Sequence, residues 1–424
     1  MVEPFGVLVV GSGGREHALA LALRRDPAVG AVHVAPGNPG TAQVATNHPV
    51  DILDGPAVAE LARELGVGLV VVGPEAPLVA GVADAVRAAG VACFGPSAAA
   101  ARLEGSKAFA KDVMDAAGVP TARAHVCTTP AQVAAALADF GPPHVVKDDG
   151  LAAGKGVVVT ADRDAALAHA AACGDVVVEE FLDGPEVSLF AVTDGRTVRA
   201  LQPAQDFKRV GDGDTGPNTG GMSAYTPLPW APADLVAEVT RTVLQPTVDE
   251  MAARGTPFAG LLYAGLALTA RGVRVIEFNA RFGDPETQPL LARLRTPLGV
   301  LLHAAATGAL HEQPELEWSP DAAVAVVLAA GGYPGTPLTG GVLGGLDDPD
   351  ARAEGGSLVV QAGTALDAAG RVVSSGGRVL AVVGTGPDLA GARAAAYRRI
   401  ETVTLEHGFY RTDIAAAAAR PEKS

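Results

Sequence analysis

The chain has 424 residues, and its 32 basic and 47 acidic residues give a formal net charge of -15. This length exceeds what one hydrophobic core usually supports, so two to four domains are expected. The acidic balance gives no footprint for nucleic acid or for an anionic membrane surface, so local groups must bind any phosphate.

The first hundred residues alternate between short apolar strands and helical patterns such as Ala57 to Leu65. The predicted strands are Phe5 to Val10, Ala31 to Ala35, Leu69 to Val72 and Val91 to Phe94. Strands rich in Val and Leu that are separated by helices indicate a parallel sheet covered on both faces. Each strand ends in a glycine or proline-glycine turn, and ligands of such sheets bind at these carboxyl ends.

The turn Gly11-Ser12-Gly13-Gly14 follows the first strand and opens a helix, so amides at Gly13 and Gly14 could receive a phosphate. A dinucleotide fingerprint fails at two points. Glu16 occupies the place of its third glycine, and the second strand ends without an acidic residue for a ribose. NAD binding is therefore disfavoured, which leaves a site for a sugar monophosphate or a tight turn without a ligand.

A helix is predicted from Ser106 to Ala117, and Lys107 near its start is a basic candidate for binding an anion. The alternative for a single lysine of this kind is a solvated surface charge. A small strand-rich unit follows, from about Arg123 to Val192.

Within this unit, Lys147 ends one strand, and a glycine-rich loop leads to the next strand at Val157. Such a loop can fold over a triphosphate, with N–H groups around Gly154 and Gly156 and the charge of Lys155 facing the phosphate oxygens. It is not a Walker A loop, because no Lys-Ser or Lys-Thr pair opens a helix there.

The next strand ends in Glu179-Glu180-Phe181-Leu182, and Glu186 follows a Gly-Pro turn. A backbone edge with a carboxylate can hydrogen-bond an adenine amino group, and a second carboxylate can take ribose hydroxyls. This segment therefore predicts the nucleoside end of an ATP site.

Beyond it, the stretch from Gln202 to Tyr225 is polar, glycine-rich and long for a structureless loop, and loops of this kind are usually functional or disordered. A helix is predicted from about Asp234 to Ala253, with strands near Leu261 to Thr269 and Val273 to Phe278. After about residue 322, short strands and a final helix from Leu389 to about Leu405 indicate a separate closing domain.

Glu277 and Asn279 stand two apart on a predicted strand, so their side chains point to the same face. One carboxylate and one amide oxygen suit Mg²⁺, which prefers a few hard oxygen ligands and keeps waters and nucleotide phosphates. Arg281 and Asp284 follow on a loop that can reach the same cleft. The alternative is an edge strand whose polar residues face outward.

Together these segments resemble the ATP-grasp superfamily and, within it, the family of glycinamide ribonucleotide synthetases, or phosphoribosylamine-glycine ligases. The resemblance spans nearly the whole chain. It is carried, in order, by Gly11 to His17, Ala35 to Asn38, Gly73 to Leu78, Leu103 to Lys107, Asp149 to Gly156, Asp212 to Met222 and Glu277 to Gln288.

The resemblance implies an α/β ATP-grasp fold with four parts. These are an amino-terminal Rossmann-like parallel sheet domain over residues 1–104, a central ATP-grasp domain over 105–122 and 193–322, a lid subdomain over 123–192, and a carboxy-terminal α+β domain over 323–424.

The resemblance also implies that glycine is joined to 5-phosphoribosylamine with ATP, giving glycinamide ribonucleotide, ADP and phosphate in de novo purine biosynthesis. The glycine carboxylate attacks the γ-phosphoryl group, and the sugar amine then displaces phosphate from glycyl phosphate. Such a transfer relies on positioning and charge neutralisation, which Mg²⁺ or Mn²⁺ at Glu277 and Asn279, with Lys107 and Lys147, would supply.

Further roles follow from position within the resembling segments. Gly13, Gly14 and Asn38 are candidates for the ribose phosphate end, and Glu75 for the sugar hydroxyls or amine. Asp212, Arg281 and Asp284 are candidates for glycine or the amine and, with Lys155, form the predicted catalytic set. Three features depart from the family pattern: Asp148 stands where a small residue is usual, Ala172 to Asp175 is short, and Ser223 stands where glycine is usual.

Two rival interpretations are a different ATP-grasp ligase and a nucleotide-binding protein without activity, and substrate dependence of turnover separates them. Cys93, Cys127 and Cys173 are odd in number and lack metal-ligand spacing, which indicates reduced thiols. The start has no basic targeting region, and no apolar run approaches membrane-spanning length. We expect a cytoplasmic monomer with small-molecule substrates and neither nucleic acid nor membrane as partner.

Overall fold

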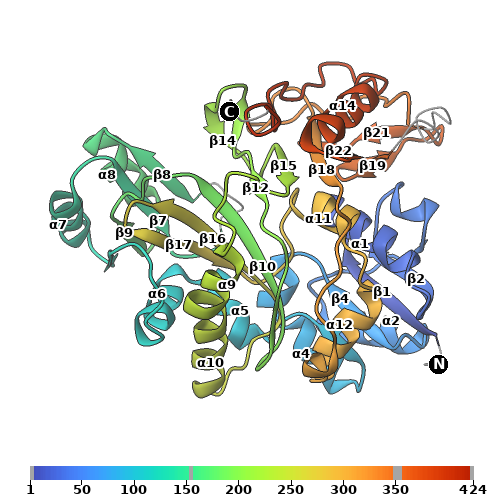
Figure 1. Cartoon of the computed structure of the whole chain (residues 1–424), viewed down its shortest axis with the longest axis horizontal. Coiled ribbons are helices and arrows are strands. Elements are labelled where there is room, and N and C mark those ends of the chain that lie inside the picture. Colours follow the sequence, from blue (N-terminus) through green and yellow to red (C-terminus); the bar gives the residue numbers. More distant parts are fainter. Residues whose placement is uncertain (1–3, 152–155, 347–355, 421–424) are drawn as a thin grey trace.

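The computed structural model describes residues 4–151, 156–346 and 356–420. Its strands form four larger sheets and two small hairpins in this part of the chain. Figure 1 shows the amino-terminal sheet at the lower right, a small unit at the left edge and the carboxy-terminal strands at the top. No helix among the described residues is long and apolar enough to cross a membrane.

The amino-terminal sheet is parallel, with the strand order β3-β2-β1-β4-β5. Its strands are β1 (Phe5–Gly11), β2 (Val29–Pro36), β3 (Thr46–Asn47), β4 (Leu69–Val72) and β5 (Ala92–Phe94). The four predicted strands are all present, and the two residues of β3 extend the sheet beyond β2. The short elements between these strands are η1 (Thr41–Gln43) and α3 (Glu75–Val79).

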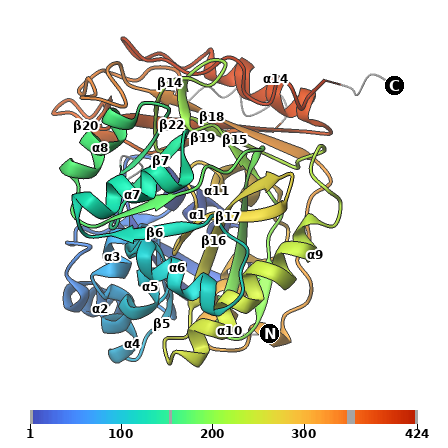
Figure 2. The same ribbon diagram turned by 90° about the vertical axis from the view of Figure 1, so that its left-hand side faces the viewer.

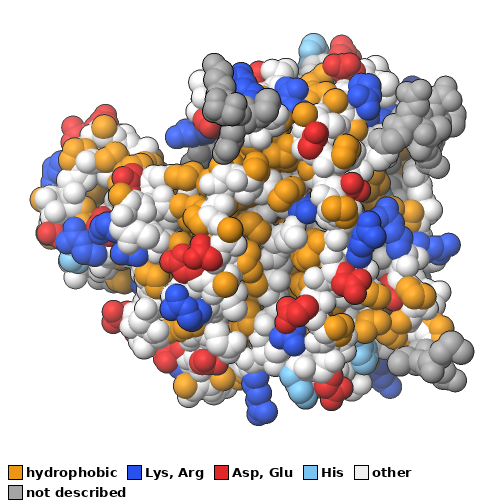
Figure 3. Space-filling model, in the orientation of Figure 1, with side chains coloured by type: hydrophobic (Ala, Val, Ile, Leu, Met, Phe, Trp, Pro, Cys, Tyr) orange, Lys and Arg blue, Asp and Glu red, His pale blue; other side chains and the backbone are white. Residues whose placement is uncertain are grey.

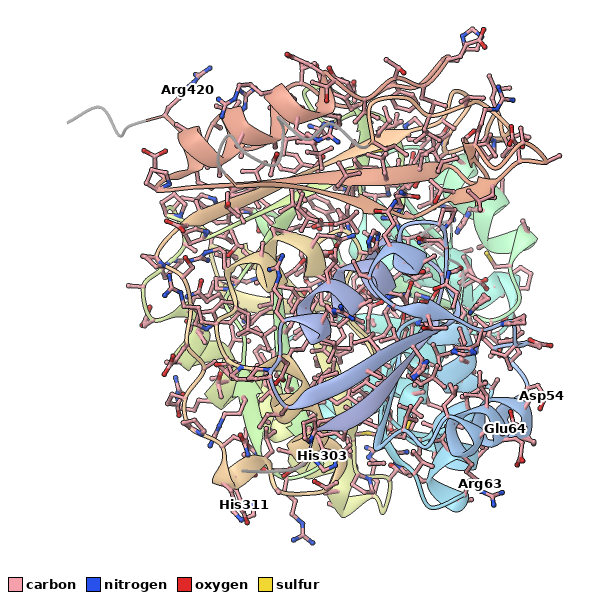
Figure 4. The ribbon with its side chains drawn as sticks, turned by 90° about the vertical axis from the view of Figure 1, so that its right-hand side faces the viewer. Asp54, Arg63, Glu64, His303, His311 and Arg420 are labelled. Atoms are coloured by element: carbon pink, nitrogen blue, oxygen red, sulfur yellow. The ribbon has the colours of Figure 1, made fainter. Side chains whose placement is uncertain are left out.

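Four helices cover this sheet: α1 (Gly14–Arg24), α2 (Gly55–Glu64), α4 (Val82–Ala88) and α12 (Leu298–Ala306). Val10 and its neighbours on one face share a hydrophobic core with α2 and α4. Val9 and its neighbours on the other face share a second core with α1 and α12. The predicted burial of both faces is confirmed. Figure 4 shows the two ends of α2, at Asp54 and Glu64, on the outside.

The second sheet is antiparallel, with the order β11-β10-β16-β17. Its strands are β10 (Glu186–Asp194), β11 (Val198–Ala200), β16 (Ala259–Thr269) and β17 (Gly272–Asn279). Leu262 and Leu266 enter one core while Leu261 and Tyr263 enter the other, so this sheet is also buried on both faces. The helices of this part are α5 (Ala98–Gly105), α6 (Lys107–Ala116), α11 (Thr287–Arg293) and the short η3 (Leu310–Glu312).

The helix predicted from Asp234 to Ala253 is interrupted. It consists of α9 (Leu235–Val239), a π-helical turn η2 (Thr240–Leu244) and α10 (Gln245–Ala253). Pro246 has no N–H, and its ring would clash with the carbonyl of residue 242 in a regular α-helix. We attribute the wider turn before it to this proline.

The third sheet, with the order β6-β9-β7-β8, forms the small unit, which we call the lid (residues 124–179). Its strands are β6 (Ala124–Cys127), β7 (His144–Asp148), β8 (Val157–Thr160) and β9 (Val176–Glu179). Helices α7 (Pro130–Phe140) and α8 (Arg163–Ala172) enclose a separate small core with one face of the sheet. Figure 2 looks onto these two helices.

The lid was predicted to reach residue 192, but residues 186–192 belong to β10. That strand pairs with β16 along its whole length, from Glu186 opposite Ala267 to Asp194 opposite Ala259. The hydrogen-bond ladder therefore assigns these residues to the second sheet, and we propose that the lid ends between Glu179 and Glu186.

The fourth sheet has the order β12-β15-β18-β22-β19. Its strands are β12 (Gln205–Asp206), β15 (Ser223–Thr226), β18 (Ala322–Ala329), β19 (Ser357–Gln361) and β22 (Arg378–Gly386). Helix α14 (Leu389–Ile400) packs on this sheet and ends before the predicted Leu405. Two hairpins accompany the sheet: β13 (Arg209–Gly211) with β14 (Thr215–Asn218), and β20 (Thr364–Leu366) with β21 (Val372–Ser374). On the face in Figure 3, acidic and basic side chains are interspersed.

His17 joins α1 to the fourth sheet. Its side chain is buried, and its Nδ1 accepts a hydrogen bond from the backbone N–H of Gln361 at 2.9 Å. Burial lowers the pKa of His17 to about 4. The imidazole is therefore neutral at neutral pH and links helix α1 to the fourth sheet through one ring nitrogen.

His17 should make the fold acid-sensitive. Because its pKa is lower in the folded state than the ordinary 6.5, the unfolded chain takes up the proton first as pH falls. The contribution of His17 to the free energy of unfolding is thus fully present above pH 6.5. About 3 kcal/mol of the free energy of unfolding is lost as pH falls to about 4. A His17→Gln variant should lose this part of the acid dependence in urea unfolding between pH 7 and 4. The exposed His311, labelled in Figure 4, provides a control as His311→Gln; parallel curves for both variants would contradict the assignment.

Candidate active site

β17 carries a bulge just before Glu277. Gly265 of β16 pairs with Glu277, whereas the next residue, Leu266, pairs with Val275, so Ile276 has no partner in the ladder. A bulge of this kind re-aims the neighbouring side chains and frees backbone groups. The freed carbonyl of Ile276 accepts a hydrogen bond from the lid.

The donor is Lys147 of β7. Its Nζ lies 2.8 Å from the carbonyl oxygen of Ile276 and 2.8 Å from Glu179 Oε2. Lys111 of α6 lies 3.0 Å from Glu179 Oε1. Burial lowers the pKa of Lys111 against the attraction of Glu179. Both carboxylate oxygens of Glu179 thus form ion pairs with lysines. The sequence analysis had predicted that a carboxylate of this segment binds the adenine amino group.

Cations surround Glu277. Burial alone would raise the pKa of its carboxyl group, but the charges of Lys208, Lys147 and Lys107 outweigh burial and lower it. Glu277 is therefore ionised at neutral pH. Together with the amide oxygen of Asn279, it offers two hard oxygen donors, a set that fits Mg²⁺ or Mn²⁺. Among the described residues, no group of three or more His, Cys, Asp or Glu side chains could hold a metal ion.

Lys208 was not singled out in the sequence. Its Nζ lies 2.5 Å from Glu186 Oε2. Burial alone would lower the pKa of Lys208, but the negative charges of Asp206, Glu186 and Glu277 outweigh burial and raise it. Burial in turn raises the pKa of Asp206 to about 7 against the attraction of Lys208. The lysine therefore pairs directly with Glu186, the predicted ribose ligand, and acts on Glu277, the predicted metal ligand, through its charge.

Lys107 lies at the entrance to the glycine-rich loop. Its Nζ donates to the carbonyl of Gly150 at 2.9 Å. The carboxylate of Asp149 accepts hydrogen bonds from Ser106 Oγ at 3.2 Å and from the N–H of Ala108 at 3.0 Å. These contacts fix the first residues of the loop against the amino-terminal end of α6, where its dipole favours an anion.

At the other end of the loop, the carbonyl of Gly156 accepts a hydrogen bond from the N–H of Asp148 at 2.8 Å. Gly154 and Lys155 lie outside the described residues. Asp148 is half-buried at the end of β7. The pKa of Cys173 is raised first by burial of the thiol and then by the negative charge of Asp148.

The predicted adenine edge continues β9. The N–H of Glu180 donates to the carbonyl of Arg123 at 3.0 Å, and its carboxylate pairs with Arg123 and Arg271. Phe181 is 45% exposed and Leu182 is half-buried. The N–H and the carboxylate of Glu180 are therefore engaged by protein groups, and contact of this edge with a base stays a prediction.

Arg281 is the centre of a second cluster. Its guanidinium contacts Glu75 Oε2 and Glu104 Oε1, both at 3.3 Å, and donates to Asn279 Oδ1 at 3.4 Å. Burial raises the pKa of Glu104, whereas the charges of Arg281 and Arg15 overcome burial and lower the pKa of Glu75. The cluster joins the amino-terminal domain to the end of β17.

Asp284 forms the third cluster. Arg378 of β22 lies 3.1 Å from Asp284 Oδ2, and it also donates to the carbonyl of Gly221 at 3.1 Å and to that of Gly220. Gln288 of α11 donates to Asp284 Oδ1 at 2.6 Å. One arginine of the fourth sheet thereby joins the loop after β17 to the end of the polar, glycine-rich stretch.

Family models describe three consecutive parts of this chain. The N domain of phosphoribosylglycinamide synthetase matches residues 5–104, its ATP-grasp (A) domain matches 105–287, and its C domain matches 323–417. The chain belongs to the phosphoribosylglycinamide synthetase family.

Relatives agree with this family assignment. A phosphoribosylamine-glycine ligase of Streptomyces coelicolor is 68% identical over 97% of this chain and 99% of its own length. One from Mycobacterium bovis is 59% identical over 97% and 98%. The crystal structure of the Thermotoga maritima ligase has 34% identity and a TM-score of 0.83, covering 96% of this chain and 99% of its own.

A more distant structure defines the fold. The biotin carboxylase domain of Hydrogenobacter thermophilus 2-oxoglutarate carboxylase, solved with MgADP, is 15% identical with a TM-score of 0.74, covering 96% of this chain and 92% of its own. The expected α/β ATP-grasp fold and the resemblance to this synthetase family are confirmed.

The glycine turn differs from its predicted form in this family member. The N–H of Gly13, which was predicted to bind a phosphate, donates to Glu16 Oε2 at 2.6 Å. A Cβ on Gly11 would lie 2.6 Å from Glu16 Cγ. The glutamate in the third-glycine position thus fills the turn. Gly14 borders Asp284 and Gln288 instead.

Asn38 is also used within the protein. Its Nδ2 donates to the carbonyls of Ser12 at 2.8 Å and Gln361 at 3.0 Å, and its Oδ1 accepts from the N–H groups of Gly40 and Thr41. The side chain holds three segments together and has its donors and acceptor engaged. The direct contact with a ribose phosphate predicted for it stays untested, and the geometry favours a supporting role.

Asp212 lies at the tip of the β13–β14 hairpin. Its carboxylate accepts hydrogen bonds from the N–H of Thr412 at 2.8 Å and from the Thr412 hydroxyl at 2.5 Å. Arg411, almost fully buried, pairs with Asp214 and Asp413 beside it. Within the described chain, no hydrogen bond or ion pair joins Asp212 to the clusters of Arg281 and Asp284. Its contact with glycine or the amine therefore stays a prediction.

Three residues that organise the site escaped the sequence analysis. Glu104 stood in a resembling segment without an assigned role, and Lys208 followed Asp206 in the polar stretch, where alternation on a short strand could have drawn attention to it. Arg378 begins β22 directly after the turn residues Gly376 and Gly377 and has no local signal.

Proposed function

We propose that this chain joins glycine to 5-phosphoribosylamine with ATP, giving glycinamide ribonucleotide, ADP and phosphate through glycyl phosphate. The family membership and the names of the close relatives support the overall reaction. The observation that carries the nucleotide chemistry is the convergence of Lys107, Lys147 and Lys208 on an ionised Glu277 where the lid meets β17.

In the first step, an oxygen of the glycine carboxylate bonds to the γ-phosphorus, and the bond to the β–γ bridging oxygen breaks, so ADP leaves. In the second step, the sugar amine attacks the carbonyl carbon, phosphate leaves, and the amine loses a proton. Lysine charges near transferred phosphoryl oxygens act by positioning and electrostatic stabilisation, and no side-chain nucleophile is needed.

Glu277 and Asn279 would hold the divalent metal, Mg²⁺ or Mn²⁺. A bound divalent ion neutralises charge on phosphate oxygens and orients them. Gly154, Lys155 and Gly156 would cover the phosphates, while Phe181, Leu182 and Glu186 would meet the nucleoside.

The Arg281 and Asp284 clusters would bind glycine and the sugar amine. Arg281 offers a planar guanidinium for a carboxylate, with Glu75 next to it. Asp284, whose pKa Arg378 and Arg15 lower against burial, offers an anion to an amine. Gly14 lies beside it. A cytoplasmic setting, a monomeric state and the four-domain division remain predictions that accompany this proposal.

The test is ADP release by the purified protein with Mg²⁺ and ATP. Glycine and freshly generated phosphoribosylamine are supplied singly and together, and product is followed by mass. We expect release that needs both substrates. ADP release with another carboxylate or amine would show that the chain is a different ATP-grasp ligase. ATP binding without ADP release would show that it is a nucleotide-binding protein without activity.

A further inference from the structure

Gln288 carries an unpaired buried oxygen beside the Asp284 cluster. The residue lies in the first turn of α11 and is 2% exposed. Its Nε2 donates to Asp284 Oδ1 at 2.6 Å, whereas its Oε1 is buried and has no hydrogen-bond partner among the described residues. Buried side-chain oxygens are nearly always hydrogen-bonded, so this one calls for an explanation.

The orientation of the amide is fixed by its neighbour. Burial alone would raise the pKa of Asp284, but the charges of Arg378 and Arg15 outweigh burial and lower it, so the carboxylate is ionised and can only accept. The NH₂ group of Gln288 must face it, since a flipped amide would place two acceptors together. The unpaired atom is therefore the carbonyl oxygen.

Gly14 of α1 packs closely against this amide. A Cβ on Gly14 would lie 3.0 Å from Gln288 Nε2, 3.4 Å from Asp284 Oδ1 and 3.4 Å from the Cβ of Ala362. A larger residue at this position would push against the amide. The Asp284 carboxylate and the amide nitrogen of Gln288 border the start of α1, and the unpaired Oε1 belongs to the same amide. The Asp284 carboxylate and this oxygen are both acceptors and suit a group with several N–H or O–H donors.

We propose that Gln288 is a substrate-positioning residue whose Oε1 accepts a hydrogen bond from an amine or hydroxyl donor that enters beside Gly14 and Asp284. The inference rests on the proposed function, which supplies two such donors: the amino group of glycine and the amine or hydroxyls of the phosphorylated sugar. An acceptor on an uncharged amide orients the donor while leaving the charge of Asp284 unchanged.

Two variants isolate the oxygen. Gln288→Met and Gln288→Glu both remove the Nε2 donor to Asp284, but only Gln288→Glu keeps an acceptor oxygen at this position. Affinities for glycine and, separately, for ribose 5-phosphate are measured by calorimetry with ADP and Mg²⁺ present. We expect Gln288→Met to weaken one of the two ligands about tenfold, with Gln288→Glu binding it more tightly than Gln288→Met.

The ligand that weakens identifies the donor: glycine points to its amino group, ribose 5-phosphate to the sugar. In turnover assays, the KM of that substrate alone should rise while the KM of ATP stays unchanged, and exposed Gln43→Met is the control. Equal weakening by both variants, or unchanged binding of both ligands, would overturn the inference. Because binding is read without turnover, failure of wild-type ligation would count against the proposed function and not against Gln288.

Discussion

Replacing Glu277 with Gln is expected to lower kcat about a thousandfold or more, which corresponds to about 4 kcal/mol of lost transition-state stabilisation. The variant keeps the size of the side chain and removes its charge. That charge is maintained by Lys208, Lys147 and Lys107, which lower the pKa of Glu277 against burial. A neutral amide would weaken metal binding and leave these cations without their shared anion.

The fold should survive this change. Lys147 keeps Glu179, and Lys208 keeps Glu186, so no lysine is left as an isolated buried charge. We expect a Tm within about 5 °C of wild type, while Mn²⁺ binding in the presence of ADP, followed by EPR, should weaken strongly. Glu60→Gln, a change at an exposed carboxylate of α2, is the matched control. If more than a tenth of the activity remained with unchanged Mn²⁺ binding, Glu277 would not be a metal ligand.

Sequence reasoning succeeded where the signal is local. The apolar runs of β1, β2, β4 and β5 specify a buried parallel sheet by themselves, and all four strands form where expected. Glu277 and Asn279 lie on one strand as expected, and two residues so spaced share a face whatever that strand pairs with, while their role as metal ligands stays a prediction. Lys147 was found because it ends a strand before a glycine-rich loop.

One missed contact is local: Glu16, three residues after Gly13, accepts the hydrogen bond from the N–H of Gly13. The other missed contacts join segments distant in sequence. Asn38 engages Gln361 across 323 residues, and Arg378 reaches Asp284 across 94. No local pattern predicts such partners, so the sequence identified polar residues at strand ends but not which of them hold the domains together.

Replacing Arg281 with Lys is expected to lower kcat/KM for glycine or phosphoribosylamine by about a hundredfold or more, although the charge is kept. The guanidinium contacts Glu75, Glu104 and Asn279 at once, at 3.3 to 3.4 Å. A lysine ammonium is a single point and cannot reproduce this fork. Breaking one member of a buried charged network costs about 3–5 kcal/mol, so a lower Tm should accompany the kinetic loss.

Kinetics and stability together decide the role of Arg281. The pKa of Glu104, already raised by burial, should rise further without the guanidinium. Adding Glu104→Gln to Arg281→Lys should therefore restore part of the Tm, because it removes the carboxylate left without its partner, but should restore none of the lost kcat/KM. Arg274→Lys, on the same strand, is the matched control and should leave both quantities near wild type. Recovery of activity along with Tm in the double variant would reduce Arg281 to a structural link between the amino-terminal domain and β17.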